Sequence, residues 1–285
     1  MSHLEVLKWV FEIMLASFFG GILGAITGLG GGIVIVPFLT LLMNVPIQVA
    51  IGASIISVIA VSSGAGSVYV RDRVTNIRIA MFLEIWTAAG AVVGAGILAR
   101  FLNGSELTIL FGFSLLLSLI PVLAKIGEEL PKGVKNDALA NFLKLNSSYY
   151  DMKLQKEIPY NVTGIPASMG IMFLAGIISG LLGIGAGVLK VLAHEIAMKV
   201  PSKVSTATSN FMIGVTAATA AGIYLRQGLI VPYLAAPVAL GVILGAFTGT
   251  RLMEKMSNAR IRQVFALALG VLGIEMVLRG FGAKF

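Results

Sequence analysis

The chain has 285 residues, of which 57% are hydrophobic and only 12% are charged. Soluble domains carry about 25% charged residues, so this composition excludes an ordinary soluble protein and predicts a polytopic membrane protein. The net charge of +8 does not indicate a nucleic-acid partner, because Lys and Arg at the cytoplasmic ends of membrane helices account for such a balance. The chain has no cysteine and two histidines, so we expect no disulfide, no metal site and no cofactor.

The first 124 residues are predicted to form a transmembrane repeat that begins with a broken helix. Residues 7–26 are apolar apart from Lys8 and Glu12 and can span a bilayer. A glycine cluster at residues 28–32 follows, and the next apolar run covers only residues 33–43 before Pro46 breaks the chain. Eleven residues form a helix about 17 Å long, roughly half of the hydrocarbon core, so this run is predicted to be a half-helix. Three full spans should follow, at residues 49–70, 79–99 and 107–124.

Residues 125–163 differ in character from the rest of the chain. They contain six Lys, five Asp or Glu and too few apolar residues to cross a bilayer. We expect a cytoplasmic loop with a short amphipathic helix at residues 137–145. A hairpin should follow at residues 148–162, with its turn around residues 152–155.

Residues 164–285 are predicted to form a second transmembrane repeat, because they duplicate the first. A shift of 155 positions, without a gap, places the glycines of the first cluster on Gly183, Gly185 and Gly187. Each broken hairpin returns the chain to its own side and three spans follow it, so the two copies should be inverted. The predicted fold class is an all-α polytopic membrane protein of two inverted repeats, each a glycine-broken helical hairpin plus three transmembrane helices, with 8–10 membrane segments. The second-copy elements are expected at residues 165–182, 188–198 (the half-helix), 204–225, 229–250 and 264–278.

The distribution of basic residues predicts the side of the membrane on which each loop lies. If both hairpins cross twice, fifteen of the 21 Lys and Arg residues lie on the side of the loop, five lie on the other side, and Lys190 lies in the membrane. If the hairpins are re-entrant, we expect Lys199 and Lys203 to change sides. In both cases the loop is cytoplasmic and both termini are outside, in the cell (inner or plasma) membrane. The fifteen are Arg71, Arg73, Arg78, Lys125, Lys132, Lys135, Lys144, Lys153, Lys156, Lys199, Lys203, Arg251, Lys255, Arg260 and Arg262.

The two glycine turns predict a binding site for an anion. A half-helix that starts inside the membrane presents free N–H groups and about half a positive charge at its N-terminus. Paired glycine-broken segments in the two halves of a transporter point to its substrate site. The alternatives are that the glycines only allow close helix packing and that the nearby hydroxyls bond to their own helix. The candidate substrate-binding residues are Gly30, Gly31, Gly32, Ser54, Gly185, Gly187, Lys190, Thr208, Ser209 and Asn210.

Two charged residues fall inside predicted membrane segments, where ionisable side chains are usually functional. Lys190 either pairs with the substrate, pairs with Glu195 or reaches the membrane interface. Glu84 is a candidate for coupling transport to a proton or a cation, and the alternative is an ion pair with Arg78. Tyr224, near the end of a predicted span, is expected to be an interfacial anchor.

Several motifs are similar to those of one membrane-protein family. The chain resembles the TauE/SafE family of sulfite and organosulfonate exporters over nearly its whole length, and this resemblance implies a multi-pass permease for small sulfur-containing anions. Family members often have a third glycine and a proline where this chain has Ala186 and Leu192, so the resemblance does not imply two symmetric sites. The matching motifs are Gly28-Leu29-Gly30-Gly31-Gly32, Pro37, the Ala50-x-Gly52-x-Ser54 pattern, Tyr69, the Gly90 and Gly94 pair, and the run from Ser179 to Gly187.

We therefore expect a secondary transporter, an exporter of a small sulfur-containing anion such as sulfite, sulfonate or sulfoacetate. It would work by alternating access, with the site between the two glycine turns. The alternative is an anion channel, which would show flux without saturation. Nothing in the sequence supports an enzyme. The expected partners are the small anionic substrate and the lipid bilayer, and the sequence leaves open whether the chain forms a homo-oligomer.

Overall fold

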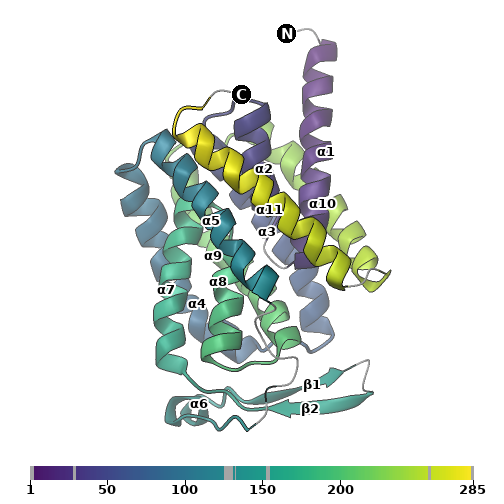
Figure 1. Ribbon diagram of the computed structural model, residues 1–285, viewed down its shortest axis with the longest axis vertical. Helices are drawn as coiled ribbons and strands as arrows, with labels where there is room; N and C mark the ends of the chain where they lie inside the picture. The colour runs from purple at the N-terminus through teal and green to yellow at the C-terminus, as the bar shows by residue number, and fades with distance from the viewer. Residues whose placement is uncertain are drawn as a thin grey trace.

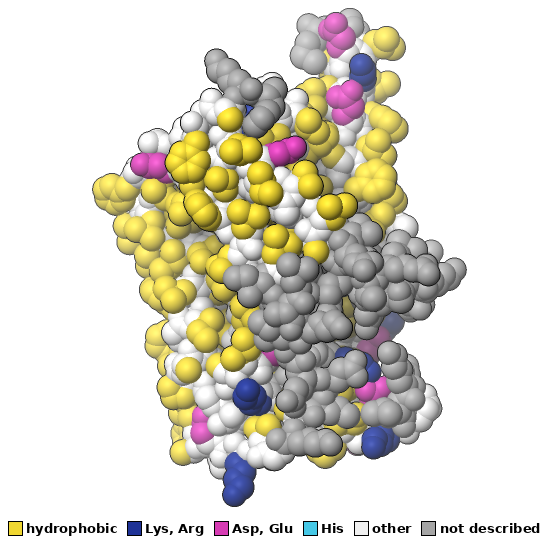
Figure 2. All heavy atoms as spheres, viewed as in Figure 1, with side chains coloured by type: hydrophobic (Ala, Val, Ile, Leu, Met, Phe, Trp, Pro, Cys, Tyr) yellow, Lys and Arg dark blue, Asp and Glu magenta, His cyan; other side chains and the backbone are white. Residues whose placement is uncertain are grey.

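The computed structural model describes residues 3–27, 30–124, 131, 133–151, 155–255 and 258–283. Gly28 and Leu29 of the first glycine cluster, and residues 125–130, 132 and 152–154 of the loop, therefore lie outside the described residues. Among the described residues, five helices are long and apolar enough to cross a membrane. Figure 2 shows hydrophobic side chains over the sides of the bundle, with charged side chains gathered toward its two ends. The prediction of an α-helical polytopic membrane protein is confirmed.

The elements follow the predicted order, and the two predicted half-helices are present. The first copy comprises α1 (His3–Thr27), α2 (Gly32–Pro37) with the π-helical turn η1 (Phe38–Leu42), α3 (Ile47–Arg71), α4 (Ile77–Val92) with η2 (Val93–Ile97) and η3 (Leu98–Arg100), and α5 (Gly104–Ala124). The loop holds α6 (Ala138–Phe142) and two antiparallel strands, β1 (Ser147–Asp151) and β2 (Lys156–Tyr160). The second copy comprises α7 (Ile165–Leu182), α8 (Gly187–Leu192) with the π-helical turn η4 (Ala193–Ala197), α9 (Ser202–Arg226), α10 (Pro232–Lys255) and α11 (Asn258–Gly280).

Both broken hairpins turn back toward the end of the molecule from which they start. The N–H of Thr163, before α7, donates to the carbonyl of Met198, after η4, at 3.2 Å. On the other hairpin, Trp9 of α1 and Leu42 of η1 line one groove. In Figure 1 the α1–α2 hairpin reaches the upper end of the bundle and the α7–α8 hairpin the lower end. The hairpins therefore have a re-entrant shape, which the sequence left open.

Both chain ends lie at the end of the bundle opposite to β1 and β2 (Figure 1). Lys203 Nζ lies 2.6 Å from Asp151 Oδ2 on β1, so Lys203 is on the side of the loop. The expectation that re-entrant hairpins would move Lys203 to the other side is wrong, because a hairpin that returns to its own end leaves the next residues there. The count of fifteen basic residues against five therefore fits the observed hairpin shape.

The first helix of each hairpin packs on a helix of the other copy. α1 lies along α10, and α7 lies along α4. These contacts are close because a Cβ atom at Gly90 of α4 would overlap the carbonyl oxygen of Phe173, and one at Gly245 of α10 would overlap that of Phe18. Such backbone-to-backbone approach is the usual role of small residues between membrane helices. The copies are thus interlocked rather than laid side by side.

Tyr224 is buried, with 2% of its surface exposed, and is not an interfacial anchor. Its hydroxyl lies 3.1 Å from the carbonyl oxygens of Gly180 and Leu181, in the last turn of α7. The last carbonyls of a helix have no intrahelical partner, so a buried hydroxyl satisfies them here. Tyr224 therefore fixes the end of α7 just before the second glycine turn.

The β-hairpin of the loop is joined to the apolar helices by a polar cluster around Asn76. Asn76 Oδ1 accepts from the N–H of Ile79 and caps α4, while its Nδ2 donates to the hydroxyl of Tyr160 at 2.8 Å. Burial raises the pKa of Tyr160 to about 12, so this hydroxyl stays neutral in the physiological range. The loop is thereby attached to the start of α4.

Arg279 of α11 holds the end of the first half-helix. Its guanidinium donates to the carbonyl of Leu41 at 2.8 Å and to Asn44 Oδ1 at 2.6 Å. A cation at a helix C-terminus also interacts favourably with the helix dipole. We expect Arg279→Met to lower the free energy of unfolding by about 1–2 kcal/mol, measured by thermal unfolding in detergent. The exposed Arg226, in the last turn of α9, provides the control, and an equal loss in Arg226→Met would contradict this role.

Candidate functional site

The two glycine turns meet at the centre of the molecule, on either side of Val58. Gly30 and Gly185 have φ angles of 80° and 73°, in the left-handed region that favours glycine. A Cβ atom at Gly30 would lie 3.0 Å from the Val58 side chain, and one at Gly185 would lie 3.1 Å from it. A Cβ at Gly32 would lie 2.8 Å from the carbonyl oxygen of Gly183. The turns are therefore in direct contact, as the internal repeat predicted.

Ser54 and Ser209, the equivalent serines of the two copies, both bond to the second turn. Ser54 Oγ donates to the carbonyl of Gly183 at 2.6 Å, and Ser209 Oγ donates to that of Gly187 at 3.3 Å. Both side chains are fully buried. They lie at the predicted place, and there they tie α3 and α9 to the backbone of the turn.

A cavity of about 110 Å³ adjoins the start of both half-helices. Ile33 of α2 and Gly187 of α8 lie in its wall, together with the hydroxyl residues Ser114 and Ser118 of α5. Both serines also donate to carbonyls of their own helix, at 2.7 Å. The remaining lining residues are Leu117, Ile178, Ile184, Ala186, Val188, Leu189 and Leu192.

The first turn of α8 lies in the wall of this cavity and has backbone N–H groups that the helix does not use. The first hydrogen bond of α8 runs from the N–H of Lys190 to the carbonyl of Ala186, at 3.2 Å. The N–H groups of Gly187, Val188 and Leu189 come before that bond and have no acceptor within the helix. All three residues line the cavity. The arrangement therefore suits a small anion, which accepts hydrogen bonds and is favoured at the positive end of a helix.

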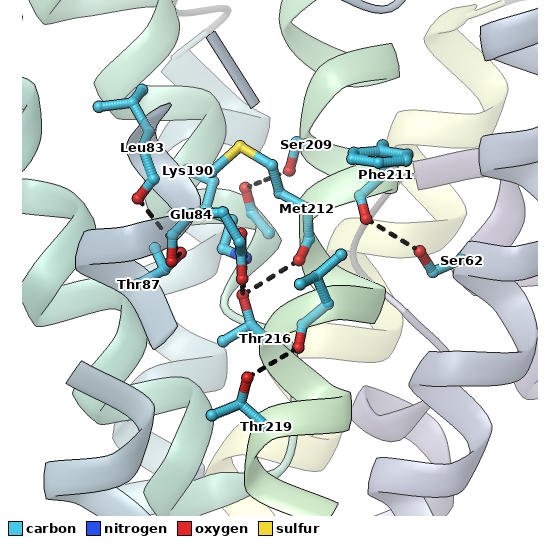
Figure 3. Close-up of polar contacts among 12 residues, drawn as sticks. Ser62, Leu83, Glu84, Thr87, Lys190, Ser209, Phe211, Met212, Thr216 and Thr219 are labelled. Carbon is cyan, nitrogen blue, oxygen red and sulfur yellow. Dashed lines mark hydrogen bonds and ion pairs between the residues drawn. The ribbon is translucent and has the colours of Figure 1, made fainter. Parts of the chain in front are cut away.

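Glu84, Lys190 and Thr216 form a second polar cluster, in which α4, α8 and α9 each contribute one side chain (Figure 3). Lys190 is completely buried and Glu84 is 6% exposed. Lys190 Nζ lies 3.7 Å from Glu84 Oε2. Thr216 Oγ1 accepts a hydrogen bond from Lys190 Nζ and donates one to Glu84 Oε1. An ion pair thus joins the two copies in the interior of the helical bundle.

Glu84 and Lys190 pair with each other and not with the partners considered from the sequence, Arg78 and Glu195. Glu84 does not pair with Arg78, whose guanidinium donates to the carbonyl of Lys144 at 3.0 Å. Lys190 does not pair with Glu195, which interacts with the hydroxyl groups of neighbouring serines. Lys190 is also absent from the cavity lining, because its side chain extends toward Glu84.

Two other predicted ligands, Thr208 and Asn210, form hydrogen bonds with residues outside the glycine turns. Thr208 Oγ1 accepts from the N–H of Asn76 at 3.1 Å, at the start of α4. Asn210 Nδ2 donates to the carbonyl of Thr206, and its buried Oδ1 has no hydrogen-bond partner among the described residues. Gly31 is the N-cap residue of α2 and its carbonyl accepts from Val34 and Ile35.

Sequence reasoning missed Ser114, Ser118 and Thr216. None has a polar counterpart in the other copy, where Leu269, Gly273 and Val61 stand at the equivalent positions. Hydroxyl side chains inside helices commonly bond to their own backbone, so their presence alone is no signal. Only the packing of α5 and α9 reveals them.

The comparisons with known proteins agree with this architecture. The family model described as "Sulfite exporter TauE/SafE" matches residues 13–276. The "Probable membrane transporter protein YunE" of Bacillus subtilis is 27% identical over 268 residues, which cover 91% of this chain and 94% of that protein. "Probable membrane transporter protein MJ0441" of Methanocaldococcus jannaschii is 25% identical, over 96% of this chain and 100% of its own length. No solved structure gives a significant match.

The family match covers nearly the whole chain. Both relatives are named as probable membrane transporters, and the alignments cover nearly their whole length. The apolar helices agree with a multi-pass protein of the lipid bilayer. The chain is therefore a multi-pass membrane transporter and belongs to the TauE/SafE family.

Proposed function

We propose that this transporter exports a small sulfur-containing anion, such as sulfite, a sulfonate or sulfoacetate, by alternating access. The observation that carries the proposal is the cavity at the start of both half-helices. Its wall includes Gly187, Val188 and Leu189, whose N–H groups come before the first hydrogen bond of α8. Its volume of about 110 Å³ suits a small oxyanion, since drug-sized ligands occupy pockets of about 300–1,000 Å³.

Within this proposal, the backbone N–H groups of residues 187–189 bind the anion. The hydroxyls of Ser114 and Ser118 would turn from the carbonyls of their own helix to donate to it. The glycine turns bring the backbone close to the ligand, and Ser54 and Ser209 position the turns. None of the described residues that line the cavity has a charged side chain, so selectivity would depend on size and hydrogen bonding. The proposed site lies at the second turn, where this chain has Ala186 in place of the glycine that is common in the family.

Alternating access would come from two inverted repeats. Two observations support this part of the proposal. The hairpins reach opposite ends of the bundle, and exchanging the copies turns the α1–α10 contact into the α7–α4 contact. Rocking one such repeat against the other around a central site is a common mechanism in transporters of this kind. The loop of residues 125–163 would be cytoplasmic, as the excess of basic residues on its side suggests.

The proposal is tested by filling the cavity. Ser118→Leu should abolish saturable flux of radiolabelled sulfite and sulfonate in liposomes, because the larger side chain occupies the space of the anion. Ser118→Ala should reduce flux by about tenfold or less, since only one neutral hydrogen bond is lost. Ser63→Leu is the matched control, because Ser63 is exposed and also bonds to a carbonyl of its own helix.

Two outcomes would contradict the proposal. Normal saturable flux through a folded Ser118→Leu protein would exclude the cavity as the site. Flux that rises without saturation as the anion concentration increases would favour the channel alternative. Thermal unfolding of each variant in detergent shows whether it is folded.

A further inference from the structure

A continuous hydrogen-bonded path runs from a buried ammonium group to a buried carboxylate. Lys190 Nζ donates to Thr216 Oγ1, and Thr216 Oγ1 donates to Glu84 Oε1 (Figure 3). Glu84 Oε2 has no hydrogen-bond partner among the described residues and is free to accept a proton. We propose that Glu84, Thr216 and Lys190 form the proton-coupling site of the transporter. This inference rests on the transport function proposed above.

The path permits proton transfer with balanced charges. An N–H bond of Lys190 breaks as an O–H bond forms on Thr216, and the original Thr216 proton moves to Glu84 Oε1. The products are a neutral amine, a hydroxyl and a carboxylic acid, so the pair exists in a charged and a neutral form. Thr216 Oγ1 also lies 3.0 Å from the carbonyl of Met212, a second acceptor toward which its single proton can turn.

Loading the site requires one proton from water. That proton binds the carboxylate of Glu84, and the cluster then carries one positive charge, on Lys190. Releasing the proton restores the neutral ion pair. The equivalent positions of the other copy hold Ile35, Ala239 and Val61, so the duplication supplies one such site and not two.

A proton fits this site better than a metal cation. The carboxylate already has a counter-charge in Lys190, so the cluster has no net negative charge to attract a metal ion. Hard cations also require several oxygen ligands, and no group of three acidic, His or Cys side chains suited to a metal is present among the described residues. A carboxylate that pairs with an ammonium group can still be protonated.

Helix α8 links this cluster to the anion cavity. Val188, Leu189 and Leu192 line the cavity, whereas Lys190 projects from the opposite face of the helix toward Glu84. The two sites are therefore separated by about one helix diameter, roughly 10 Å, of low-dielectric interior. A bound anion favours the protonated, positive cluster, and by linkage the protonated cluster favours the anion. A monovalent anion and a proton would thus move together, without net charge.

Other titratable groups around the cluster are few. η4 carries His194 and Glu195, and α9 carries Lys203, Tyr224 and Arg226 toward its two ends. Lys203 pairs with Asp151 of the loop. α4 itself adds Arg78 at its start, and α7 adds none. Glu84 is thus the one carboxylate that the described residues place beside Lys190.

The test uses the purified full chain in liposomes that contain a pH-sensitive dye, with methanesulfonate as the transported anion. A sulfonate stays ionised, so any proton movement must pass through the protein. Wild type should acidify the lumen as methanesulfonate enters. Glu84→Gln should retain exchange of internal for external methanesulfonate but lose the coupled pH change. Thr216→Val removes the hydrogen bond that stabilises the ionised carboxylate of Glu84, so the coupled pH change should persist to higher pH, and Thr216→Ser should restore the wild-type pH dependence.

A second measurement does not depend on transport. Infrared difference spectra across a pH titration should show a buried carboxylic acid band in wild type and in Glu106→Gln, a control at an exposed acid, but not in Glu84→Gln. Absence of a Glu84-dependent band, or an unchanged proton-to-anion ratio in Glu84→Gln, would overturn the coupling site. A Glu84-dependent band without any methanesulfonate flux would support proton binding at Glu84 and refute the proposed substrate class.

Discussion

Replacing Lys190 with methionine is expected to lower the free energy of unfolding by about 3–5 kcal/mol. Methionine has a similar length and no polar group, so the main change is the loss of the counter-charge of Glu84. Glu84 is 6% exposed and Lys190 is completely buried, so the variant leaves an unpaired carboxylate with little access to water. Unpaired charges inside proteins and membranes are among the most destabilising features known. Thermal unfolding in detergent measures the loss.

The double variant Lys190→Met, Glu84→Gln separates the charge from the packing. Removing both partners leaves no buried charge, so most of the stability should return. The coupling free energy from the double-mutant cycle should therefore be large, about 2–3 kcal/mol. As a control, Lys8→Met breaks the exposed pair between Lys8 and Glu12, where we expect about 0.5 kcal/mol or less. Similar losses in Lys190→Met and Lys8→Met would show that the buried pair carries no charge.

The helices and half-helices of the fold were predictable because the length of each apolar run and the positions of the glycines can be read directly from the local sequence. An apolar run of eleven residues after a glycine cluster is too short to span, and in both copies the structure contains a half-helix at that place. The partner of Lys190 was not predictable, since the candidates considered were close in sequence. Glu84 lies 106 positions away and reaches Lys190 because α7 packs on α4 of the other copy. Interlocking of this kind leaves no trace in a single sequence.

In the candidate site, too, the internal repeat predicted some of the contacts, whereas others depend on how the helices pack. Ser54 and Ser209 occupy equivalent positions of the two copies, and both bond to the backbone of the second glycine turn, whereas their predicted contact with the substrate stays a prediction. Thr208 and Asn210 are the sequence neighbours of Ser209, but adjacent residues on a helix point about 100° apart. They therefore face other parts of the structure. A run of consecutive polar residues in a helix thus indicates how deep in the membrane they lie, but only the helical periodicity indicates which side of the helix each one occupies.

Gly32→Ala is expected to lower the free energy of unfolding by about 1–3 kcal/mol or more, because the added methyl group separates the two glycine turns. A Cβ atom at Gly32 would lie 2.7 Å from Ser54 Oγ and 2.8 Å from the carbonyl oxygen of Gly183. These are the two atoms of the hydrogen bond between α3 and the second turn. The methyl group therefore cannot be accommodated by rotating one side chain, since one of its neighbours is backbone.

Gly64→Ala on α3 is the matched control, because a Cβ atom there meets nothing within 4 Å. Replacing glycine by alanine within a helix should stabilise the protein by about 0.5–1 kcal/mol through backbone entropy and helix propensity. The two substitutions add the same methyl group and should shift the unfolding temperature in opposite directions. If Gly32→Ala also raised the unfolding temperature, the glycines of the first turn would be explained by chain flexibility alone. The expected loss instead places the contact between the turns among the interactions that hold the two copies together.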